Sequence, residues 1–166
     1  DISIIDMQEG VLKVISTSGD NMLGGDDIDR LIVNYWVNKY KLIESKELIT
    51  LAKKIKEELT FKESCSNTLH DGRVLSLERK TLEALISPLI EHTINITKDT
   101  LKESGLPNIN SIILVGGSTR IPLISKMLRN NFDTTIISEN ISDSNIYIDP
   151  EKVVVSGAAM QAENLT

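Results

Sequence analysis

The sequence predicts an α/β fold. Strand-like apolar runs and helical apolar patterns alternate along the chain, which is typical of this class. In two places, "LGGDDID" (23–29) and "ILVGGSTRIP" (113–122), apolar residues lead into two glycines and then into a predicted helix. With 166 residues the chain can bury a sizeable core, as one domain with room for two subdomains.

The first half of the chain predicts two hairpins with two helices between them. "DISIID" and "VLKVIST" indicate strands joined by "MQEG", and "CSNTLHDGRVLSL" indicates a hairpin that turns at Asp71 and Gly72. In the first helix, Asp26 and Asp27 stand where a cap and first-turn acids belong. Its expected core face holds Ile28, Leu31, Ile32, Tyr35 and Trp36. The second helix, 46–59, is expected to carry its four lysines away from a face formed by Leu48, Leu51, Ala52, Ile55 and Leu59.

The second half begins with a helix from "ERKTLEALIS" that Pro88 is expected to restart or kink. Gly105 and Pro107 should end it. The β-branched and leucine residues of 112–115 predict a strand buried on both faces. For the helix that follows, Ser118 or Thr119 is a candidate cap and Pro122 suits the first turn.

The C-terminal part predicts an irregular loop around a short strand and then a last helix. "NFDTTIISENISDSNIYI" is polar and irregular, and "DPEKVVVSGAAMQAENL" has a helical pattern. Asp149 is its expected cap, and Pro150 its expected first residue.

The composition excludes several kinds of protein. A net charge of −6 with scattered lysines argues against nucleic acid as a partner. The only cysteine, Cys65, excludes an internal disulfide framework and indicates a reducing compartment, the cytoplasm. His70 and His92 lie far apart, without the spacing of a zinc site. No apolar run approaches the roughly 20 residues that cross a bilayer, so no membrane association is expected. The abrupt opening on "DISII" indicates a fragment of a longer protein.

The two glycine turns are candidate ligand sites. A strand, a bare turn and a helix start together present free backbone N–H groups, which favour an anion or a nucleotide. Both turns could border one cleft, because such sites form where strands end and helices begin. An ordinary strand-to-helix connection explains either turn taken alone. The pair therefore favours a nucleotide-binding module over a purely structural domain.

Three stretches resemble signatures of the DnaK-type, seventy-kilodalton heat-shock chaperones. They are "GDNMLGGDDID" (19–29), "ILVGGSTRIPLI" (113–124) and "IDPEKVVVSGAAMQA" (148–162), in the family's order. The resemblance covers the chain and implies the second lobe of an actin-like, ribonuclease H-like ATPase domain. This lobe has a mixed sheet with flanking helices and a smaller α+β subdomain. Subdomain IIA would span about 1–23 and 87–166, and subdomain IIB about 24–86. Asp26 and "IDPEKVV" favour the HscA branch, which serves iron–sulfur cluster assembly.

The resemblance also implies a nucleotide site. The residues that match the loop around the adenosine are Gly116, Gly117, Ser118 and Arg120. The guanidinium of Arg120 can stack on adenine, with a solvated surface arginine as the alternative. The residues that match other contacts are Gly24 and Gly25 near the ribose and phosphates, Lys56 at the ribose hydroxyls, Thr60 at the adenine edge and Glu151 near the nucleotide. A place on a plain helix surface explains Lys56 and Thr60 nearly as well as a nucleotide contact does. For Glu151, the role of an acid in the first turn of a helix is a sufficient explanation.

The sequence departs from the family at the adenine site. Lys53 and Glu57 stand where many members have glutamate and arginine, and that arginine forms the second wall around adenine. Looser nucleotide binding follows from the change. The connection 131–147 is also longer than usual, for which we have no functional account.

The resemblance implies an ATP-hydrolysing chaperone that uses ATP or ADP, Mg²⁺ and K⁺. Asp1 matches an aspartate near the bound cation, whereas the catalytic groups belong to the first lobe, so this piece alone should be inactive. The implied partners are a J-domain co-chaperone, the first lobe and a client, either an iron–sulfur scaffold protein or general folding substrates. Other actin-like ATPases, sugar kinases and a nucleotide-independent interaction module are the alternatives. The chain is expected to fold by itself, because apolar faces recur on its helices.

Overall fold

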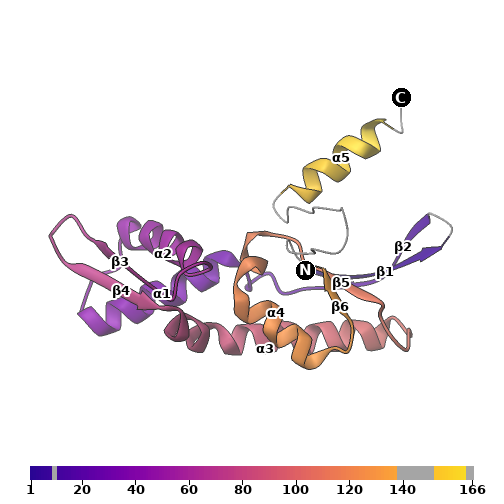
Figure 1. Ribbon diagram of the computed structural model, residues 1–166, viewed down its shortest axis with the longest axis horizontal. Coiled ribbons are helices and arrows are strands. Elements are labelled where there is room, and N and C mark those ends of the chain that lie inside the picture. The colour runs from indigo at the N-terminus through magenta and orange to yellow at the C-terminus, as the bar shows by residue number, and fades with distance from the viewer. Residues whose placement is uncertain (9–10, 138–151, 164–166) are drawn as a thin grey trace. The chain divides into compact units, whose positions relative to one another are not determined.

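The structure is a computed structural model that describes residues 1–8, 11–137 and 152–163. The chain is mixed α/β and divides into two compact units, residues 1–107 and 108–166 (Figure 1). The elements of the first unit are β1 (Ile2–Gln8), β2 (Val11–Ser18), α1 (Gly25–Tyr40), α2 (Lys46–Glu58), β3 (Ser64–Thr68), β4 (Val74–Glu78) and α3 (Arg79–Glu103). Those of the second are β5 (Ser111–Ile113), a 3-10 turn η1 (Gly117–Arg120), α4 (Pro122–Asn131), β6 (Thr135–Ile137) and α5 (Val153–Glu163).

The strands β1 and β2 form the predicted N-terminal hairpin. They pair antiparallel, with Ile2 opposite Ser18 and an irregularity between Ile4 and Ile5. The hairpin is held to α3 by Ser16, whose hydroxyl donates a hydrogen bond to the Thr100 carbonyl at 3.0 Å. Its exposed apolar side chains are Ile5, Met7, Val11, Leu12 and Val14.

The helices α1 and α2 and the β3–β4 hairpin gather around the first turns of α3 (Figure 1). Trp36 is fully buried among them, and its indole Nε1 donates a hydrogen bond to the Ser76 carbonyl of β4 at 3.2 Å. The β3–β4 hairpin turns as predicted, with Gly72 at φ +86, a conformation that favours glycine. The two predicted helices and this hairpin are confirmed.

Helix α3 continues through Pro88, so of the two predicted alternatives the restart is wrong, whereas a kink stays a prediction. Proline removes one backbone hydrogen bond, but the helix buries the same face on both sides of it. That face holds Leu82, Ile86, Ile90 and Ile94. The helix ends at Glu103, and Gly105 follows at φ +71, as predicted. No helix in the described part of the chain is long and apolar enough to cross a membrane.

In the second unit, β5 and β6 pair in parallel, with Ile112 opposite Ile136. The prediction that 112–115 is buried on both faces is wrong, since Ile113 is 54% and Val115 47% exposed. The reason is that β5 has only three residues and pairs, within the described residues, with β6 alone. Leu114 is the buried member of this run.

The predicted cap of the helix that follows is also wrong. The turn η1 intervenes, so α4 begins at Pro122 with Ile121 before it and no side-chain cap. The Thr119 hydroxyl instead donates a hydrogen bond to the Gly116 carbonyl at 2.6 Å. Pro122 occupies the first turn as predicted, where its missing N–H costs nothing.

The C-terminal predictions are tested only in part. The short strand β6 and the last helix α5 are present, whereas Asp149, Pro150 and the rest of the 131–147 connection beyond Ile137 lie outside the described residues. The described strands form three two-stranded sheets, two antiparallel and one parallel. A single mixed sheet stays a prediction.

Candidate functional site

The first glycine turn leads directly into α1. Gly24 lies at the helix N-cap in an extended conformation, and its N–H donates a hydrogen bond to the Asp27 carboxylate at 2.8 Å. Asp26 and Asp27 occupy the first helical turn as predicted. Because a helix N-terminus carries a partial positive charge, these acids stabilise it.

Lys56 of α2 reaches across to this turn. Its Nζ donates a hydrogen bond to the Gly25 carbonyl at 2.9 Å and lies 2.8 Å from Oδ1 of Asp29. The contact with Asp29 is an ion pair without well-aligned hydrogen-bond geometry at that oxygen. The two charged side chains are almost completely buried, at 10% and 5% exposed. The structure thus brings two of the predicted site residues, Gly25 and Lys56, into direct contact.

Burial decides the ionisation of this pair. Removal from water raises the pKa of the Asp29 carboxyl, and the Lys56 ammonium 2.8 Å away opposes that rise. The carboxylate therefore depends on Lys56 for its charged form. Loss of the lysine would leave a buried charge without its counterion.

Two expectations about this region need correction. Lys56 is buried, so the plain-surface alternative and the placement of all four lysines away from the buried face are wrong for it. Asp29 was not among the predicted residues. Its signal was an acid between Ile28 and Ile32, on the apolar face of α1. Helical spacing shows that such an acid is buried, but not which basic side chain faces it.

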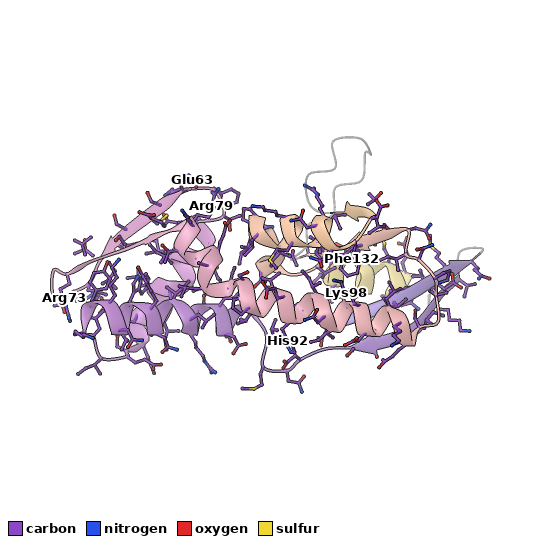
Figure 2. The ribbon with its side chains drawn as sticks, turned by 90° about the horizontal axis from the view of Figure 1, so that it is seen from below. Glu63, Arg73, Arg79, His92, Lys98 and Phe132 are labelled. Atoms are coloured by element: carbon purple, nitrogen blue, oxygen red, sulfur yellow. The ribbon has the colours of Figure 1, made fainter. Side chains whose placement is uncertain are left out.

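Arg79 binds the backbone at the end of α2. It was not among the predicted site residues. Its Nε donates a hydrogen bond to the Leu59 carbonyl at 2.8 Å, and its Nη2 donates one to the Thr60 carbonyl at 3.4 Å. Glu63 pairs with the same guanidinium, and Figure 2 shows the two side chains together at the start of α3. Thr60 is half-buried in this turn, whereas Glu57 is exposed. These bonds fix the backbone that carries Thr60.

The second glycine turn lies in the second unit. Gly116 adopts φ +95, a conformation that side chains disfavour, and an added Cβ would meet no atom within 4 Å. Gly117, Ser118 and Arg120 follow in η1, where Ser118 and Arg120 are half-buried. The backbone at Gly116 is therefore bare and open.

The remaining predicted residues are Asp1 and Glu151. Asp1 is exposed, and its Oδ1 lies so close to Gly19 that a Cβ there would be 2.6 Å away. Within residues 1–8, 11–137 and 152–163, no three His, Cys, Asp or Glu side chains converge as a metal site. Glu151 lies outside the described residues.

Comparison with known proteins identifies the family. The family model described as "Hsp70 protein" matches residues 1–166. The chain belongs to the Hsp70 family. The predicted family is confirmed, and the predicted site residues now stand within a match that spans both units.

Curated members of the Hsp70 family are similar over 99% of the chain. The chaperone protein HscA homolog of Rickettsia typhi is 53% identical over 165 residues, and that of Rickettsia prowazekii is 54% identical over the same length. The homolog of Rickettsia akari is 52% identical. These relatives carry the name of the branch that the sequence favoured. The chain spans 26% of the length of each of these proteins.

Proposed function

We propose that the chain is the second nucleotide-binding lobe of an ATP-hydrolysing Hsp70 chaperone of the HscA branch. The observation that carries this proposal is the Hsp70 family match over residues 1–166. We also propose the actin-like arrangement, with a mixed sheet and flanking helices in IIA (about 1–23 and 87–166) and the smaller α+β subdomain IIB (about 24–86). Exposed apolar side chains on β1, β2 and β5 support further neighbours for these strands.

The family resemblance supports nucleotide contacts at each of the glycine turns. Gly116, Gly117, Ser118 and Arg120 would surround the adenosine, with the Arg120 guanidinium stacked on the adenine face. Gly24 and Gly25 would lie near the ribose and phosphates, where the N–H groups at the start of α1 favour an anion. Lys56, Thr60 and Glu151 would complete the contacts. The Gly25–Lys56 hydrogen bond supports a shared role for these two residues.

Hydrolysis would depend on groups outside this chain. Phosphoryl transfer needs a phosphate cradle, a metal and a group that positions water. Mg²⁺ would neutralise the charge of the phosphates, K⁺ would assist Mg²⁺ in this, and Asp1 would lie near the cations. The exposed, single carboxylate of Asp1 fits such a supporting place. The catalytic groups would come from the first lobe, so the chain alone would hold nucleotide weakly and not turn it over.

The partners follow from the branch. A chaperone of the HscA branch would work with a J-domain co-chaperone and with an iron–sulfur scaffold protein as client, in the cytoplasm. The names of the Rickettsia relatives support this branch. A general protein-folding chaperone is the second candidate, since the family match alone fits it equally well. A sugar kinase or another actin-like protein is disfavoured by the same match.

Arg120→Ala should weaken ADP binding by the full-length protein. A stacked guanidinium contributes about 0.5–2 kcal/mol, so we expect a loss of roughly twofold to thirtyfold in affinity. Isothermal titration with ADP measures it. Arg129→Ala, which removes an arginine from the last turn of α4, is the matched control and should bind as the wild type does. Equal affinities in the Arg120 variant and the wild type would contradict the proposed adenine contact.

Glu57→Arg should slow ADP release. Glu57 is exposed on the last turn of α2, where many family members have the second arginine of the adenine sandwich. Restoring the guanidinium should add about 0.5–2 kcal/mol, most of it in the off-rate, so release should slow by roughly twofold to thirtyfold. Stopped-flow release of a fluorescent ADP analogue tests this in the full-length protein. Glu44→Arg makes the same charge change in the loop before α2, and an equal effect there would count against stacking.

A further inference from the structure

The buried pair of Asp29 and Lys56 is costly for a protein that needs only stability. Two charges lose their hydration when they enter the core, and an apolar pair of similar volume is often as stable or more so. Yet both side chains are nearly inaccessible, and they stand beside the glycine turn before α1. A binding task for the ammonium accounts for the charges better than stability does.

The geometry fixes the ammonium from two sides. Gly25 and Asp29 are four residues apart in α1, so they lie on the same face of the helix, one turn from each other. Lys56 enters from α2 and contacts the carbonyl of the first and the carboxylate of the second. A long lysine side chain has four flexible bonds, and these two contacts remove most of its freedom.

An ammonium has three N–H donors. The Gly25 carbonyl takes one, and the Asp29 carboxylate attracts the ammonium with its full charge. At least one donor can still be offered to an oxygen atom of a ligand at the glycine turn. The direction of that donor depends on where Asp29 holds the nitrogen.

We propose that Asp29 is a positioning residue for nucleotide binding, which holds the Lys56 ammonium against Gly25 so that its free donor meets a ribose hydroxyl. This inference rests on the proposed function. Asp29 itself touches no nucleotide in this arrangement. Its removal should therefore weaken recognition of the ribose hydroxyls selectively and leave the adenine and phosphate contacts in place.

The test compares ADP with its 2′,3′-dideoxy analogue on the full-length protein. The dissociation constant of the dideoxy analogue divided by that of ADP measures how much the ribose hydroxyls contribute to binding. In Asp29→Asn the Lys56 ammonium should lose its hydrogen bond to the ribose hydroxyl. The ratio should therefore fall by about tenfold. Asp26→Asn removes an equal charge from the first turn of the same helix and should keep the wild-type ratio. Asp29→Glu retains the charge but shifts it by one methylene, and it should also lower the ratio.

The outcomes separate the inference from the proposed function. Binding of ADP by the wild type supports the proposed function, and its absence overturns both. A wild-type ratio near one, or equal losses of both nucleotides in Asp29→Asn, overturns the inference and leaves ADP binding intact. If Asp29→Asn does not fold, Asp29→Glu decides, and an unchanged ratio in it overturns the inference.

Discussion

Lys56→Met should lower the free energy of unfolding of the 166-residue chain by about 3–5 kcal/mol, because it leaves the buried Asp29 carboxylate without its counterion. The double variant Asp29→Asn/Lys56→Met removes both charges and should recover most of this loss. Urea denaturation followed by the fluorescence of Trp36, the single tryptophan of the chain, reports on the first unit. A double variant as unstable as Lys56→Met would contradict the role of the pair.

The stability of Lys56→Met should depend on pH in a defined direction. Burial raises the pKa of Asp29 above its ordinary value, and Lys56 restrains that rise, so its removal should raise the pKa further. A raised folded-state pKa gives stability that is present at low pH and is lost as the pH rises through it. The deficit of Lys56→Met relative to the wild type should therefore shrink as the pH is lowered below neutral. A constant deficit would show that the carboxylate does not cause it.

Trp36→Ala should be about as damaging, with a loss of about 3–5 kcal/mol. The indole of Trp36 projects from α1, is fully buried and contacts β4 of the β3–β4 hairpin, so its removal leaves a large cavity. It also takes away the donor for the Ser76 carbonyl. Trp36→Phe keeps most of the volume and should cost clearly less. Urea denaturation followed by far-UV circular dichroism compares the three proteins, and equal stability of Trp36→Ala and the wild type would contradict the structure of this core.

Local patterns predicted the secondary structure well, because their causes are local. The helical spacing around Trp36 and the turn at Gly72 depend on residues within a few positions of each other, and the structure confirms both. The burial of 112–115 depended on neighbouring strands that the sequence does not reveal, and there the prediction was wrong. The cap of α4 failed for a similar reason, since the 3-10 turn that replaces it has no clear sequence signal.

The sequence predicts a set of positions for the candidate site, but not the contacts that join them. The glycine turn and Lys56 followed from motifs, whereas the contact between them joins residues 31 positions apart. Asp29 and Arg79 act through long-range contacts, with Lys56 and with the carbonyls at the end of α2. Such contacts depend on how α1, α2 and α3 pack, and a single sequence does not fix that packing.

Steady-state ATP hydrolysis by the full-length protein and by residues 1–166 alone tests directly whether the chain is one lobe of an ATPase. If the chain is one lobe of an Hsp70 ATPase, the full-length protein should hydrolyse ATP in a magnesium-dependent way. The isolated chain should show no turnover above background, even with magnesium and potassium. An inactive full-length protein would contradict the assignment of the chain as one lobe of an ATPase. Steady hydrolysis by the isolated chain, abolished by Arg120→Ala, would contradict it too.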